Sequence, residues 1–100
     1  MKNYYIYGTK EINFNSLQED LALLFKCTLN EHDSSWWGIY AKGATKENLN
    51  IKLYPNFVEG EGHHVENKNF NYLLEIISTE TSNIASNSKY SYQLISHKKL

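Results

Sequence analysis

The fold is decided by the stretch Leu49-Asn50-Ile51-Lys52-Leu53-Tyr54, which Pro55 follows. Its apolar and polar residues alternate with the period of two of a β-strand, so the three aliphatic side chains share one face. Pro55 lacks the N–H that a strand ladder requires and is expected to end the strand. The pattern predicts a strand with one face on a core and the other face in water.

Other strand-forming runs surround this stretch. The run 34–40 contains both tryptophans and precedes it across a polar turn, which predicts a β-hairpin. The run 72–77 is apolar at odd and even positions alike, which is typical of a central strand buried on both faces. The run 4–7 predicts a short edge strand broken by Gly8, and the run 89–95 predicts a last strand before the solvated lysines of the C-terminal tail.

One amphipathic helix is predicted over 17–26. Ser16 and Glu19 fit a capping box at its start, and leucines recur through it at helical spacing. A second, short helix is predicted within 79–88. The expected fold class is therefore α+β: an antiparallel β-sheet of about four to five strands with one main N-terminal helix and one short helix, in a single domain of residues 1–100.

Composition excludes several classes of protein. Ten basic and eleven acidic residues give a net charge of −1, which argues against a strongly basic nucleic-acid binder. The single cysteine, Cys27, leaves no disulfide framework and is interpreted as a small buried hydrophobe. No apolar run approaches the length of a membrane span. The first residues lack the apolar segment of a secretory signal, so a cytoplasmic location is expected.

The acidic residues are unevenly distributed. The segment 57–80 carries five glutamates against one lysine, a local balance of −4, and 56–69 is predicted to be a long polar loop. An acidic loop beside an aromatic strand fits a binder of a basic protein, because complementary charge speeds association and selects partners. An ordinary solvated loop fits the charge equally well.

His63-His64 and the glutamates around them form the stretch richest in possible metal ligands. Adjacent residues of a strand point to opposite sides, and a glycine-flanked loop does not fix ligand geometry, so a solvated acidic loop is the favoured interpretation. No Gly-x-Ser-x-Gly nucleophile elbow occurs. We therefore expect no catalytic site, metal site or cofactor, and an enzyme or metal binder using these histidines is the least favoured hypothesis.

The runs 34–40, 51–59 and 69–76 carry a resemblance to a known family. They combine a serine with an aromatic-Gly-aromatic strand, an alternating strand that ends at Asn56 before an acidic loop, and a strand that begins at Phe70 and continues with tyrosine and leucines. Over about residues 34–77 the chain resembles small bacterial immunity proteins of contact-dependent growth inhibition and related polymorphic toxin systems.

The resemblance implies a protein without catalysis of its own that binds and neutralises a cognate toxin C-terminal domain, often a nuclease. The partner would present a basic surface, and neither nucleic acid nor a membrane is expected as a partner. The hypothesis that remains beside it is a small cytoplasmic protein-interaction or regulatory module unrelated to toxins. Trp36 and Trp37 should point to opposite faces of their strand, so that at most one of them is a contact. The residues expected to bind the toxin are Glu59, Glu61, His63, His64, Glu66, Glu31, Asp33 and Trp36.

Overall fold

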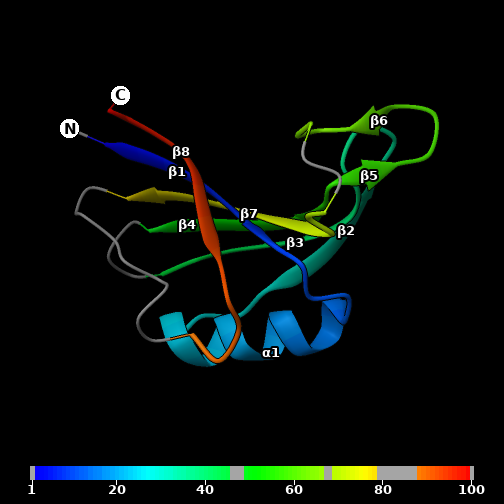
Figure 1. Cartoon of the computed structure of the whole chain (residues 1–100). Helices are drawn as coiled ribbons and strands as arrows, with labels where there is room; N and C mark the ends of the chain where they lie inside the picture. Colours follow the sequence, from blue (N-terminus) through cyan, green and yellow to red (C-terminus); the bar gives the residue numbers. More distant parts are fainter. Residues whose placement is uncertain (1, 46–48, 67–68, 79–87, 100) are drawn as a thin grey trace.

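The computed structural model describes residues 2–45, 49–66, 69–78 and 88–99, which form one helix and eight strands (Figure 1). In chain order these are β1 (Asn3–Thr9), α1 (Phe14–Phe25), β2 (Asn30–Ser34), β3 (Gly38–Ala44), β4 (Asn50–Pro55), β5 (Phe57–Val58), β6 (Gly62–His63), β7 (Tyr72–Ser78) and β8 (Gln93–Lys99). Six of the strands make one sheet in the order β2-β3-β4-β7-β1-β8, and β5 and β6 make a small hairpin. Every pairing is antiparallel.

The α+β class with one main helix is therefore confirmed, and the sheet has more strands than predicted. Three strands, β2, β5 and β6, have no predicted counterpart: β2 precedes the run 34–40 except for Ser34, and β5 and β6 fall in the predicted polar loop of 56–69. The predicted short helix of 79–88 falls on residues that lie, except for Ser88, outside the described part of the chain. Among the described residues, no helix has the length and apolar character needed to cross a membrane.

The main core lies between α1 and one face of the sheet (Figure 1). Leu17 and Leu21 of α1 are buried against Ile51 and Leu53 of β4, as the alternation of β4 and the leucine spacing of the helix predict. Neighbouring strands add further buried side chains to the same face, namely Tyr5, Tyr7, Leu74 and Ile76. We call this face of the sheet the helix face.

The opposite face, which we call the open face, is covered by described residues at one end. There Tyr54 and Leu73 are buried beneath Phe70, with the half-buried Trp37 packed beside them. The prediction that β4 has one face in water is thus wrong at Tyr54, because the aromatic residues that cover it come from distant parts of the chain. β7 lies between β4 and β1 and is buried on both faces, as predicted.

The helix begins a turn earlier than predicted. Asn13 is its N-cap: the side-chain oxygen of Asn13 accepts a hydrogen bond of 3.0 Å from the Ser16 N–H. Asparagine is among the best N-cap residues, and a cap at Asn13 places Ser16 and Glu19 inside the helix. The predicted capping box is therefore wrong.

The strand at the N-terminus is not an edge strand, because β1 lies between β7 and β8. Gly8 does not break it either. The strand continues through Thr9, and a Cβ placed on Gly8 would come within 2.6 Å of the Phe70 ring. Glycine is needed here because the aromatic ring lies directly on the strand backbone.

The tryptophans lie in a turn instead of a strand. β2 ends at Ser34 and β3 begins at Gly38, whose φ of +72° suits glycine, and the Ser34 hydroxyl accepts from the N–H groups of both tryptophans. The prediction that Trp36 and Trp37 alternate along one strand is wrong, although one is exposed and the other half-buried. The last strand also differs from the prediction at both ends. β8 starts later, at Gln93, and it continues through the lysines that were assigned to the tail.

Candidate functional site

Three of the predicted contact residues meet in one groove. Glu31 and Asp33 are two apart on β2 and therefore point to the same side of the strand. Their cross-strand partners are Ala41 and Ile39, which places them on the helix face of the sheet. Glu59 follows β5 and reaches the same groove from another part of the chain.

The groove has a volume of about 580 Å³ and lies between β2, the β5 region and the first residue of α1. No lysine or histidine is among the described residues that line it, so its charge is that of its three carboxylates. Apolar side chains are exposed between them: Ile39 is 56% exposed and Phe57 is 55% exposed. We call this feature, lined by Phe14, Glu31, Asp33, Ile39, Phe57 and Glu59, the acidic groove.

His63 lies beside the acidic groove. Its ring centroid is 5.0 Å from that of Phe57, its cross-strand partner in the β5–β6 hairpin. It lines a smaller hollow of about 200 Å³, which shares Phe57 and Pro55 with the acidic groove and is bordered by the exposed Ile12. The two hollows therefore adjoin each other along these shared residues.

His64 and Trp36 belong to a different part of the molecule. The His64 ring lies 5.2 Å from each tryptophan ring and 5.4 Å from the Tyr54 ring, centroid to centroid. Its Nε2 atom is buried and has no hydrogen-bond partner among the residues that the structure describes. The predicted contact residue His64 is thus a packing residue of the open face, and it contacts Trp36, which is 51% exposed at the rim.

Burial lowers the pKa of His64, because removing the ring from water disfavours its charged form. A hydrogen bond with the Trp36 backbone and the charge of Glu61 act in the opposite direction and offset this only in part. His64 is therefore neutral in the folded protein at neutral pH, which suits a ring enclosed by aromatic side chains.

The stability that His64 contributes is expected to fall as the pH falls. The unfolded chain protonates this histidine near its ordinary pKa of about 6.5, whereas the folded protein resists protonation, so the contribution is complete above that pH and decreases below it. Urea unfolding between about pH 8 and about pH 5.5 measures this, and His64→Gln should reduce the pH dependence. His63→Gln is the matched control because His63 is exposed. An unchanged dependence in His64→Gln would contradict the assignment.

The two remaining glutamates do not line the groove. Glu61 is exposed in the turn of the β5–β6 hairpin, where its N–H donates to the Val58 carbonyl, and Glu66 is exposed beyond the hairpin. The apolar members of the surface, Ile39 and Phe57, were not predicted. The signal that could have found Phe57 was its large aromatic side chain within a segment predicted to be a polar loop.

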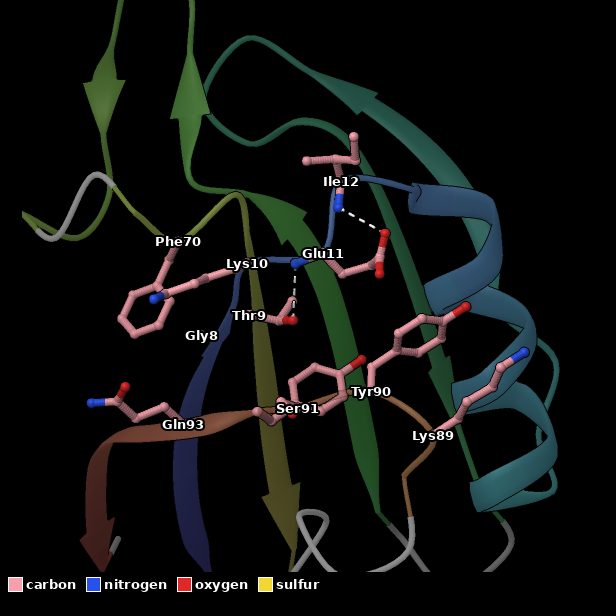
Figure 2. A pocket seen from close by; sticks show the side chains of 11 residues that line it. Gly8, Thr9, Lys10, Glu11, Ile12, Phe70, Lys89, Tyr90, Ser91 and Gln93 are labelled. Carbon is pink, nitrogen blue, oxygen red and sulfur yellow. Dashed lines mark hydrogen bonds between the residues drawn. The ribbon is translucent and has the colours of Figure 1, made fainter.

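A larger cavity lies elsewhere and contains none of the predicted contact residues. Its volume is about 770 Å³, and it is bounded by the end of β1, the segment leading into α1 and the segment before β8 (Figure 2). Lys10 and Lys89 are exposed on its walls. The Glu11 carboxylate accepts from the N–H groups of Ile12 and Asn13, so it is used to fix the chain at the start of the helix.

No group of three or more His, Cys, Asp or Glu side chains suited to a metal ion occurs in the described ranges of the chain. Cys27 is half-buried, and burial raises the pKa of its thiol, which keeps it protonated.

Comparisons of the chain with protein-family models, with curated proteins and with solved structures gave no match. Of the cavities described above, the acidic groove contains the most predicted contact residues, and we take it as the candidate site.

Proposed function

We propose that this chain is an immunity protein that binds and neutralises the C-terminal domain of a cognate toxin in the cytoplasm. The observation that carries the proposal is the acidic groove, in which three carboxylates flank exposed apolar side chains and no lysine or histidine is among the described lining residues. Protein interfaces combine apolar anchors with a charged rim, and the rim selects a partner of opposite charge. A toxin domain that binds nucleic acid has a basic surface, and its charge is therefore opposite to that of the acidic groove.

Neutralisation by this mechanism requires binding alone and no catalytic group of the chain. Ile39 and Phe57 would enter apolar pockets of the partner, while Glu31, Asp33 and Glu59 would pair with the lysines or arginines that otherwise hold phosphates. Occupation of such a surface excludes the toxin's substrate by direct competition. His63 would contact the partner from the adjoining hollow.

The first experiment asks whether the chain neutralises a toxin at all. The probe is the variable C-terminal domain encoded by the gene immediately upstream, produced together with this chain in bacteria. We expect growth to be restored and the two proteins to purify as a complex. If the neighbouring genes encode no toxin, or if growth is not restored, the protein-interaction module unrelated to toxins becomes the better hypothesis.

Charge reversal in the acidic groove is expected to weaken that complex by about 100-fold in the double variant Glu31→Lys with Glu59→Lys. Each reversal replaces an attraction with a repulsion, and a loss of about 1.4 kcal/mol at each site is a factor of ten. The dependence of the affinity on salt should also become weaker, as measured by titration calorimetry at several salt concentrations.

The matched control is Glu19→Lys, which makes the same charge change at an exposed position of α1 outside the acidic groove. Phe57→Ala tests the apolar part, because the side chain is exposed and its removal should spare the folded state while weakening the complex. Equal affinity for the double variant and for Glu19→Lys would remove the acidic groove from the mechanism, even if neutralisation itself were observed.

A further inference from the structure

The open face of the sheet carries two lysines that face each other. Strand register pairs Lys42 of β3 directly with Lys52 of β4. Both side chains are on the open face, because their neighbours Ala41 and Leu53 are buried toward the helix. Like charges directly opposite on neighbouring strands destabilise a sheet. A negative charge placed between these two lysines would offset their repulsion.

A cavity of about 400 Å³ surrounds the pair. Four strands contribute to it: Asn30 comes from β2, Lys42 from β3, Asn50 and Lys52 from β4, and Glu75 from β7. Register explains the arrangement, since Asn30 pairs with Lys42 and Lys52 pairs with Glu75, so that these side chains form one row across the sheet. The volume falls within the range of sites for small molecules.

The charges in this row do not balance. The Lys52 Nζ atom lies 3.4 Å from the Glu75 Oε2 atom and 4.1 Å from the centre of the Trp37 ring, so this lysine is held in place from two sides. Lys42 is exposed and has neither an ion pair nor a ring contact within the described residues. The cavity therefore contains one positive charge in excess.

Glu75 is itself engaged by a second partner. The Tyr4 hydroxyl donates a hydrogen bond to its carboxylate, and burial together with the negative charge of Glu75 raises the pKa of Tyr4 to about 12. Tyr4 consequently remains a hydrogen-bond donor at every physiological pH. The carboxylate of Glu75 is thus shared between Tyr4 and Lys52 and is not left to neutralise Lys42.

We propose that this cavity binds a small anion, carrying a carboxylate or a phosphate group, between Lys42 and Lys52. Ammonium groups of lysine bind both kinds of anion as compact charges, and the side-chain amides of Asn30 and Asn50 can donate further hydrogen bonds. The site lies on the face of the sheet opposite the acidic groove, so it is separate from the surface proposed to bind the toxin. Alternation along β2 produces this separation, because Glu31 and Asp33 point one way and Asn30 points the other.

The test is an NMR titration of the full chain with sodium phosphate and, separately, with sodium acetate, each at constant ionic strength maintained with sodium chloride. We expect saturable shifts of backbone amides around Lys42 and Lys52. The anion that saturates at the lower concentration identifies the source as phosphate or carboxylate.

Variants then locate the site. Lys42→Gln should weaken binding at least about tenfold, a factor that corresponds to the loss of one charged contact. Glu75→Gln should strengthen it several-fold, because Lys52 is then released from its competing carboxylate and the glutamine oxygen still accepts from Tyr4. The matched control is Lys10→Gln, because Lys10 is an exposed lysine of the separate cavity of about 770 Å³ (Figure 2), and this variant should leave binding unchanged.

Several results would overturn the proposal. One is a titration that does not saturate or that sodium chloride alone reproduces. Another is a loss of binding in Lys10→Gln but not in Lys42→Gln, which would place the anion in the other cavity. Tighter binding of an acidic peptide than of either small anion would replace the small-molecule site with a peptide site.

Discussion

Leu21→Ala is expected to lower the free energy of unfolding by about 3 kcal/mol. The Leu21 side chain is fully buried in α1 and packs in the main core between the helix and β4. Its removal loses the transfer free energy of the side chain and leaves a cavity that the surrounding strands fill only in part. Because a domain of this size is stable by roughly 5–15 kcal/mol, the loss is a large share of the total.

Leu23→Ala is the matched control. It is the same substitution in the same helix, so the change in helix propensity is equal, but Leu23 is 80% exposed. Its effect should stay within about 0.5 kcal/mol. Urea denaturation of the two variants measures the difference, and similar losses would mean that the helix does not dock through the face that carries Leu21.

Asn56→Ala is expected to cost about 3 kcal/mol as well, for a different reason. Asn56 is fully buried where β4 passes into β5. Its Nδ2 atom donates to the carbonyl groups of Phe70 at 3.0 Å and Val65 at 3.4 Å, and its Oδ1 atom accepts from the Val65 N–H at 2.9 Å. Alanine leaves these buried backbone groups without their partner, and each such loss costs about 1–3 kcal/mol.

The same variant should loosen the segment that carries His63 and His64. Hydrogen exchange at the Val65 amide is the direct readout, because its N–H loses its acceptor. Asn71→Ala is the control: the Asn71 side chain donates one hydrogen bond of 2.8 Å to the Lys10 carbonyl, in an exposed position, and should cost about 1 kcal/mol or less. Equal costs for the two variants would show that Asn56 does not organise the loop.

Local pattern predicted much of this fold correctly. The alternation of Ile51 and Leu53 gave the core face of β4, and the doubly apolar run of β7 gave the central position of that strand. Both signals depend only on which side successive residues face. The start of α1 was missed because Asn13 and Ser16 are both acceptable N-cap residues, and the structure uses Asn13.

The candidate site was predicted as a set of residues and not as a surface. The acidic stretch after β4 predicted Glu59, Glu61 and Glu66 together as contact residues. In the structure Glu59 lines the acidic groove with Glu31 and Asp33, whereas Glu61 and Glu66 lie outside it. β2 was not predicted as a strand, because its polar residues lack the alternation that burial imposes. It pairs with β3 at the sheet edge, where four of its five side chains stay exposed.

The sequence by itself determined the α+β class, the leucine face of the helix, the strands β4 and β7, and an excess of acid in the middle of the chain. These features follow from the spacing of neighbouring residues along the chain. Only the tertiary structure decided that β2 lies beside β3, that three carboxylates share the acidic groove, and that Lys42 meets Lys52 on the open face. The physical reason is that strand order and register are fixed by contacts between residues far apart in sequence, which no local pattern specifies.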